Sequence, residues 1–369
     1  MKVTVLRRYI FIIVLLIQSG IVHGQASAPK YSNEFLAIGV GARALSMSNA
    51  VVSNVSDVTA SYWNPAGLLR IKDKYQFTLM HAAYFSGIAN YDYAGFATPI
   101  DTSSFLAISI IRFGIDDIPD TRFLYDANGA LNYDNIRFFS AADYAFLLSY
   151  ARKISALKGL RVGANFKVVH RTVGDFANAW GFGLDLGLQK DFGKWKTGLM
   201  IRDITSTFNA WTHNSELVAD IYTQTGNIIP ETSLEITLPR AIFGVSRNFT
   251  FYDKVGLTPS FDLDMTFDGK RNVLIKTGLI SISPLVGLEM DYAKLAYLRL
   301  GAGEFQKIKN FDGSTRMAWQ PNFGIGVYLK YFSVDYALTD IGDQAEALYS
   351  HVFSVSVHLN DKKAGSKTK

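Results

Sequence analysis

The feature that most limits how this chain can fold is an alternation of apolar and polar residues that recurs from Tyr75 to the C-terminus. Fourteen segments follow one another, and most of them place apolar side chains at every second position. In residues 180–189, Trp, Phe and Leu occupy one face, and Gly, Asp and Gln occupy the other. The apolar face of such a strand covers the core in a soluble sandwich, but it contacts lipid in a transmembrane barrel. Alternation alone leaves both architectures open.

The lengths of these segments favour strands that cross a membrane. Most have roughly 9 to 14 residues, whereas a tilted membrane-spanning strand needs about 9 to 11 and a soluble strand averages about 5 to 6. The fourteen predicted strands are 75–83, 90–100, 104–114, 140–153, 159–172, 179–192, 195–203, 240–247, 255–267, 282–292, 296–304, 319–331, 332–338 and 351–359.

The connections between these strands also alternate in length. Those after even-numbered strands are short, and those after odd-numbered strands are long except after the first and fifth. Outer-membrane barrels have short periplasmic turns and long external loops, and closure of the barrel removes exposed strand edges. The sequence therefore predicts an all-β transmembrane antiparallel barrel over residues 75–359. Both ends of the barrel segment are expected to face the periplasm of a Gram-negative cell.

The N-terminus has the pattern of an export signal. Lys2, Arg7 and Arg8 precede a short apolar run, and a small residue, Gly24, ends the segment. The run is too short for a membrane-spanning helix, which needs about 20 residues. Residues 1–24 are therefore predicted to be a signal peptide. The chain has no cysteine, which excludes disulfides and thiolate metal sites.

The charge balance gives no indication of nucleic-acid binding. Removal of the three signal charges lowers the formal net charge from +5 to +2, and no basic stripe remains in the barrel segment. Four lysines form a basic tail over residues 360–369, which is expected to be a solvated periplasmic end.

Residues 25–74 do not alternate and are rich in small residues. The dipeptide Asn64-Pro65 and Gly67 have turn chemistry. A periplasmic segment of this length, ahead of an open-ended barrel, could fold back into the lumen. It is predicted to form a hatch, and we refer to it as the hatch segment.

This segment carries a resemblance to a known family. The motifs are Gly-Ala-Arg-Ala at 41–44, Ser-Asn-Ala at 48–50, Asp-Val-Thr-Ala at 57–60 and Tyr-Trp-Asn-Pro-Ala-Gly-Leu at 62–68. Together with residues 91–96, 174–181 and 335–340, they resemble the PorV/PorQ family of outer-membrane proteins of Bacteroidota. The same Asn-Pro-Ala-Gly region resembles the hatch of FadL-type transporters. The hatch motif residues are Asn49, Asp57, Thr59, Trp63, Asn64, Pro65 and Gly67. Ser48 departs from the family pattern, which has Gly there, and a side chain at this position would oppose a positive φ.

The resemblance implies a FadL-like barrel of about fourteen strands with an N-terminal hatch. Within the PorV/PorQ family, PorV-type members serve the type IX secretion system. They associate with its large translocon barrel and receive secreted cargo. The resemblance thus implies a partner-binding protein associated with secretion or surface assembly.

Chemistry that would indicate an enzyme is not found in the sequence. The six histidines lie far apart, and no pair has metal-ligand spacing. Ser350 with His351, and His170 with Asp175, lack any supporting motif. Neither a metal, a cofactor nor catalysis is expected.

Charged residues inside the alternating strands are expected to face a wet lumen, because a dry core would not accommodate them. They are predicted to form ion pairs that hold the hatch segment, or else to line a polar path. The acidic candidates are Asp262, Asp264, Glu289 and Asp291, and the basic candidates include Arg161, Lys167, Arg299 and Lys330.

Three functions remain open at this stage. A partner-binding barrel would keep its lumen blocked and would use its long loops, with Asp116, Asp117, Phe208 and Trp211 as first candidates for contact. A FadL-like transporter of hydrophobic small molecules would need an apolar pocket above the hatch or a sideways opening at a strand kink. The third function is that of a passive structural barrel.

Overall fold

The computed structural model describes residues 32–360 except 85–86, 127, 158, 218, 225, 227–231, 311 and 340–348. The predicted signal peptide and all but the first residue of the predicted basic tail lie outside the described residues. In the described part of the chain, no helix has the length and apolar character needed to cross a membrane.

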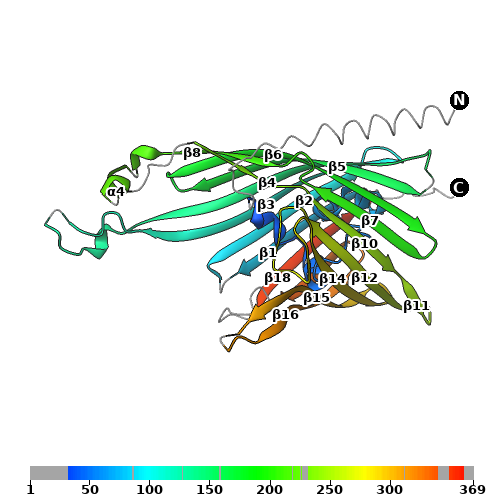
Figure 1. Cartoon of the computed structure of the whole chain (residues 1–369). Coiled ribbons are helices and arrows are strands. Elements are labelled where there is room, and N and C mark those ends of the chain that lie inside the picture. The colour runs from blue at the N-terminus through cyan, green and yellow to red at the C-terminus, as the bar shows by residue number, and fades with distance from the viewer. Residues whose placement is uncertain are drawn as a thin grey trace, which may run out of the picture.

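Fourteen antiparallel strands form a closed ring (Figure 1), which confirms the predicted fold class. The ring closes between the first and last strands, where Tyr75 lies opposite Leu359. The ring strands are β1 (Tyr75–Tyr84), β2 (Ala89–Pro99), β3 (Ser104–Asp120), β4 (Arg137–Lys153), β5 (Leu160–Val173), β6 (Ala177–Phe192), β7 (Trp195–Arg202), β10 (Arg240–Arg247), β12 (Val255–Thr266), β14 (Ser281–Tyr292), β15 (Ala296–Lys309), β16 (Thr315–Tyr328), β17 (Phe332–Thr339) and β18 (Ser350–Leu359).

Shorter elements lie in the connections. β8 (Phe208–His213) and β9 (Ser233–Ile236) pair with each other and extend the wall beyond β7 and β10. The remaining small elements are β11 (Phe249–Phe251), β13 (Ile275–Lys276), η4 (Tyr133–Asn135), η5 (Ser215–Leu217) and α4 (Ala219–Gln224).

Several strands are longer than the alternation predicted. β3 continues to Asp120 and β4 begins at Arg137, so that residues 115–120 and 137–139 of the predicted loop are strand. The pairing of β3 with β4 shifts register between Ile115 and Ile118, and that of β15 with β16 shifts near Gly303. A bulge interrupts the two-residue period. The predictions for β3 and β15 therefore stop at the bulges, because the alternation is interrupted there.

The wall of the barrel is uneven in height. The short turns lie at one end, and we call the opposite end the long-loop end. There β3 to β6 and β8 extend well beyond the other strands (Figure 1). Outward positions below this extension are mostly large apolar side chains, such as Ile108 and Phe146, which are 56% and 42% exposed.

The hatch segment lies inside the ring from residue 32 onward. Its helices are η1 (Glu34–Ala37), α2 (Ala42–Ser46), α3 (Ala60–Trp63) and η2 (Pro65–Arg70). Its apolar side chains form one buried cluster with inward residues of the wall, including Tyr91 and Ile111. The core of this barrel is therefore the contact between the hatch segment and the wall.

Candidate functional site at the contact between hatch segment and wall

The first described residues of the hatch segment are held at the long-loop half of the lumen. The Asn209 amide of β8 donates to Ser32 Oγ at 2.6 Å and to Asn33 Oδ1 at 2.8 Å. Asn33 in turn donates to Thr237 Oγ1 at 2.9 Å, and Ser32 donates to Glu235 at 2.8 Å. The segment then descends through the lumen and enters β1 at the short-turn end.

Asn64 lies at the centre of the hatch segment and is fully buried. Its side-chain oxygen accepts from the Ala66 N–H at 3.2 Å and caps η2, where Pro65 occupies the first turn. Its amide donates to the backbone oxygens of Val52 at 3.1 Å and of Leu188, on β6, at 3.0 Å. One side chain thus joins two parts of the hatch segment to the wall.

The other motif residues organise the hatch segment internally. Asp57 accepts from the Thr59 N–H at 2.8 Å and from its hydroxyl, which fixes the start of α3. The Trp63 indole donates to the Val40 oxygen at 2.8 Å, and Gly67 brings the backbone close to Val55. These contacts hold the turns of the hatch segment in place relative to one another.

Ser48 adopts the positive φ that its side chain was expected to oppose. Its φ is 49°, and that of Asn49 is 67°. The Ser48 hydroxyl accepts from the Asn322 amide of β16 at 2.7 Å. This buried hydrogen bond offsets part of the backbone strain.

Glycines of the wall allow the hatch backbone to approach. A Cβ on Gly287 would lie 2.9 Å from Met47, and one on Gly324 would contact Ser46. These glycines thus make space inside the barrel for the backbone of the hatch segment.

A chain of charges ties α2 to three strands. Arg43 forms a bidentate pair with Glu289 of β14, with distances of 2.8 and 3.1 Å. Glu289 also pairs with Arg299 of β15 at 2.7 Å, and Arg299 pairs with Asp335 of β17 at 2.6 Å. Burial acts to lower the pKa of Arg43, but the Glu289 charge outweighs it and holds this pKa above its ordinary value.

A second group of charges joins η2 to β5 and β6. Arg70 and Arg161 share Asp191, at 2.5 and 2.6 Å, and Arg70 also donates to Gln189 at 2.6 Å. Burial and the Arg161 charge together hold the pKa of Arg70 below its ordinary value, despite the opposing effect of Asp191. The segment is therefore anchored electrostatically on two sides of the lumen.

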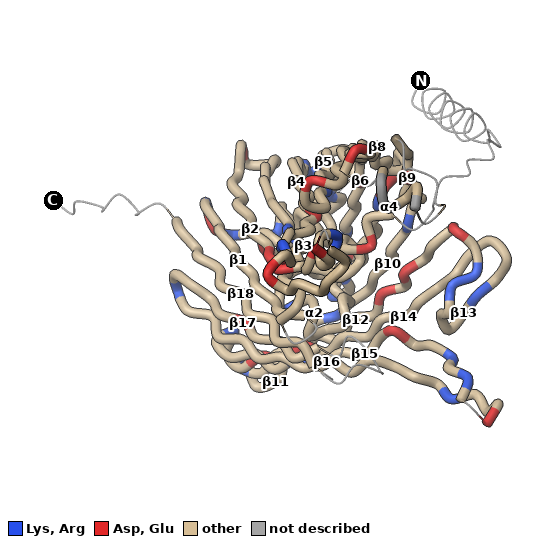
Figure 2. The backbone as a smooth tube through the Cα atoms, turned by 90° about the vertical axis from the view of Figure 1, so that its left-hand side faces the viewer, with Lys and Arg blue, Asp and Glu red and all other residues tan. Residues whose placement is uncertain are grey.

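Two predicted acidic residues contact different partners. Asp262, fully buried on β12, accepts from the Val52 N–H of the hatch segment at 2.9 Å. Asp264 pairs with Arg240 on the neighbouring strand β10. Figure 2 shows charged residues of both signs distributed among the strands.

The wall itself is interrupted between β7 and β8. Leu186 of β6 faces Ile201, whereas Phe182 faces Phe208, so the six residues 202–207 lie opposite the three residues 183–185. Asp203 and Ser206 have positive φ values of 53° and 56° in this inward bulge.

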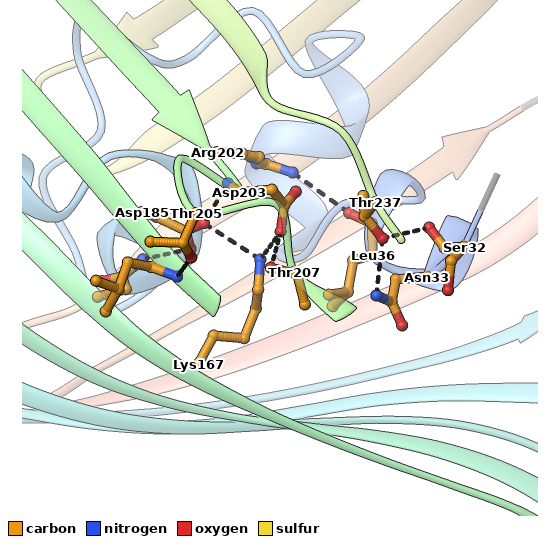
Figure 3. Close-up of polar contacts among 12 residues, drawn as sticks. Ser32, Asn33, Leu36, Lys167, Asp185, Arg202, Asp203, Thr205, Thr207 and Thr237 are labelled. Atoms are coloured by element: carbon orange, nitrogen blue, oxygen red, sulfur yellow. Dashed lines mark hydrogen bonds and ion pairs between the residues drawn. The ribbon is translucent and has the colours of Figure 1, made fainter. Parts of the chain in front are cut away.

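Lys167, on the nearby strand β5, holds the bulge from within the lumen (Figure 3). Its buried ammonium pairs with Asp185 at 3.2 Å and with Asp203, and the Thr207 hydroxyl also donates to Asp203. Nearby, Arg202 donates to the Tyr62 hydroxyl of the hatch segment at 2.9 Å and lies over its ring. The bulge, the hatch segment and the wall thus form one polar network.

Cavities border the hatch segment toward both ends of the barrel. The one at the long-loop side, beside the bulge, has a volume of about 60 Å³ and contains charged side chains such as Lys167, Arg240 and Asp268. The one at the short-turn end, about 270 Å³, contains hydroxyls of β17, β18 and β1. An apolar cavity that binds benzene has about 150 Å³. The cavity beside the bulge is smaller, and its lining is mixed, because Leu36, Leu147 and Leu238 lie beside the charged side chains.

Some predicted residues lie elsewhere. Asp291 and Lys330 are not part of the lumen network, because they lie where β14 and β16 end, next to the short turns. Phe208 and Trp211 belong to β8 rather than to a free loop, and Trp211 lies under Arg171. Asp116 and Asp117 are exposed at the β3 bulge.

The sequence reasoning missed Arg43, Asp185, Asp203 and Asp335 as network members. Asp185 and Asp335 could have been found, because each lies on the small-residue face of an alternating strand. Arg43 and Asp203 carried no such signal, since the hatch segment and the bulge have no two-residue period.

The candidate enzyme pairs are not assembled. Ser350 is buried inside the wall, while the neighbouring His351 is exposed outside and contacts Tyr336. His170 stacks on Trp180 on the outside. Among the residues that the structure describes, no group of three or more acidic or histidine side chains is placed to hold a metal ion.

No protein-family model and no curated protein matches the chain. Solved structures match it over nearly their full length. The toluene transporter TbuX of Ralstonia pickettii has 13% identity and a TM-score of 0.53, and covers 87% of this chain and 99% of its own. The toluene transporter TodX of P. putida has 13% identity and a TM-score of 0.54, with 88% and 99% covered. A Pseudomonas aeruginosa FadL homologue has 11% identity and a TM-score of 0.52, with 87% and 98% covered. The chain therefore has the fold of the FadL-like barrels.

Proposed function

We propose that this chain is a non-catalytic, partner-binding barrel of the Gram-negative outer membrane, with its lumen kept closed by the hatch segment. The observation that carries this proposal is the filled lumen. The hatch segment is hydrogen-bonded or ion-paired to β6, β8, β12, β14 and β16. The cavity beyond it is small, at about 60 Å³, and charged side chains such as Lys167 and Arg240 are part of its lining.

The shape of the wall supports a role in contact with other proteins. β3 and β4, with 17 residues each, and the β8–β9 pair project from the long-loop end (Figure 1). In this proposal the long-loop end faces the cell exterior, and the hatch segment's exit and the C-terminus face the periplasm.

The hatch motif residues support a more specific role. Asn64 and Trp63 make the buried contacts described above, Asp57 makes the half-buried contact with Thr59, and all three belong to the motif that resembles the PorV/PorQ family. We propose a PorV/PorQ-type component of type IX protein secretion or surface assembly. Its partners would be a large translocon barrel and secreted cargo.

Co-purification from native outer membranes in mild detergent tests this role. We expect the wild-type barrel to bring down a large membrane protein. A variant in which residues 121–136 are replaced by a two-residue turn should lose it while remaining a folded barrel. A matched replacement in the loop 268–280 should retain it. Recovery of the wild-type barrel alone would refute the proposal.

The alternative is a FadL-like transporter of hydrophobic small molecules. The bulge at residues 202–207 favours it, because an interrupted wall beside a cavity is the place where a route from the lumen to the bilayer would open. Toluene transporters share the fold. Toluene uptake into cells that express the chain tests this function. Uptake equal to that of cells lacking the protein would exclude it.

A further inference from the structure

A continuous row of polar and aromatic side chains crosses the outside of six adjacent strands. Paired residues follow one another in register from β1 to β6. The row consists of His81, Asp92, Arg112, Tyr144, His170 and Trp180.

The row members contact one another on the outer surface. His81 Nδ1 lies 2.7 Å from Asp92, and Arg112 lies 3.6 Å from the same carboxylate. The His170 ring stacks on Trp180 with a centroid distance of 4.1 Å. The His81 side chain is 59% exposed and that of Asp92 is 40% exposed, so neither points into the lumen.

The two neighbouring rows differ sharply in character. One step toward the short turns, the outward residues are all apolar: Leu79, Ala94, Ile110, Phe146, Val168, Phe182 and Phe208. One step toward the long loops, they are small or polar: Asn90, Gly114, Ala142, Thr172, Asn178 and Thr212. The polar row is therefore the border of the apolar band.

The direction of the Arg112 side chain gives an independent indication. Its guanidinium lies over Gly114, where a Cβ would lie 2.6 Å from Cζ, and reaches toward Asp116 at 3.5 Å. It thus extends away from the apolar band, as arginines do at a membrane interface. Charged groups on a barrel's lipid face are costly at the midplane and cost little at the interface.

We propose that this row lies in the headgroup layer of the outer leaflet and fixes the depth of the barrel on the β1–β6 side. The occupant of the surface is the lipid headgroup layer, whose phosphates and hydroxyls match Arg112, the histidines and the aromatic rings. Everything beyond the row, including Asp116 and Asp117, then stands outside the membrane. The inference rests on the outer-membrane placement proposed above, and not on any protein partner.

Single cysteines test this border, because the chain has no cysteine of its own. Ala142→Cys lies one step beyond the row on β4, and Phe146→Cys lies one step below it. In intact cells, a membrane-impermeant maleimide should label Cys at 142 at least tenfold faster than Cys at 146. Equal rates at the two positions, whether fast or slow, would overturn the proposal.

Removal of the row's charges should move the border. In the Ala142→Cys background, H81L, D92L and R112L together should slow labelling at least fivefold, because the apolar band then extends one row further. R137L, which lies beyond the row on β4, is the matched control and should leave the rate unchanged. An unchanged rate in the triple variant would contradict the depth-fixing role. Fractionation of the same cells shows whether the protein is in the outer membrane at all. Co-purification tests the proposed protein partner separately.

Discussion

The buried side-chain amide of Asn64 caps a helix and also bridges the hatch segment to the wall. Its oxygen accepts a hydrogen bond from the Ala66 N–H, and its amide donates to the backbone oxygens of Val52 and Leu188. No other side chain of similar size offers both an acceptor and two donors in this position. A buried backbone group that loses its hydrogen-bond partner costs free energy. Removing the Asn64 side chain would leave several such groups without a partner, so it should destabilise the fold.

Asn64→Ala should therefore lower the free energy of unfolding by about 2–3 kcal/mol. Thermal unfolding of the detergent-solubilised barrel measures the effect. Asn310→Ala, in an exposed turn where the side chain contacts Ser314, is the matched control and should cost less than about 1 kcal/mol. Equal losses in the two variants would argue against this account.

Asp268 gives a residue-scale prediction for pH. Burial acts to raise its pKa, but the hydrogen bond and charge of Arg271 outweigh burial and hold the pKa below its ordinary value of about 3.9. Because the folded pKa is depressed, this pair stabilises the fold above about pH 4, and the stabilisation is lost as the pH falls through the folded pKa.

The difference in unfolding temperature between the wild type and Asp268→Asn isolates this contribution. It should be constant from pH 5 to 8 and should shrink below about pH 4. The effect is small, at most about 1 kcal/mol, because Arg271 is partly exposed. A difference that grows on acidification would contradict the assignment.

At the scale of elements, the bulge between β7 and β8 is held by one cation. Lys167 lies between Asp185 and Asp203, and all three side chains are largely buried. A strand that leaves its ladder exposes backbone groups, and here the Asp203 N–H is satisfied by Asp185 at 2.9 Å. The bulge is therefore a built feature of the wall rather than a local irregularity.

Lys167→Met should destabilise the barrel by about 3–5 kcal/mol, because two buried carboxylates lose their cation. Lys190→Met, at the short-turn end of β6, is the control and should have little effect. Urea unfolding followed by tryptophan fluorescence checks both. If Lys167→Met prevents folding, K167M combined with D203N should restore part of the stability. Failure of the double variant to improve on K167M would remove Lys167 from this role.

At the scale of the whole molecule, the hatch segment and the barrel share one core. Tyr91 and Ile111 of the wall pack in the same cluster as Val40 and Leu68 of the hatch segment. The charge chain from Arg43 to Asp335 then crosses from the hatch segment through three strands. This packing is the basis on which we propose a closed lumen.

Removal of residues 32–74 should convert the barrel into an open pore. In planar lipid bilayers, the full chain is expected to show no steady ion conductance, whereas the truncated barrel should show discrete openings. Arg43→Ala should increase brief openings without a permanent pore, because Asn64 and Asp262 still hold the segment. Lys72→Ala, exposed in the same segment, is the control. Steady conductance in the full chain would contradict a closed lumen.

The sequence by itself determined the barrel, its strand order and its two unlike ends, because a two-residue period and the lengths of turns are local properties. The motif around Asn64 also indicated where the interior differs from the wall. Only the tertiary structure decided which charges meet, since Arg43 and Glu289 are joined by a fold that no local pattern encodes. It also decided where the strands bulge. A bulge interrupts the alternation from which the strands were predicted, so residues 202–207 could only be placed once β6 and the hatch segment lay beside them.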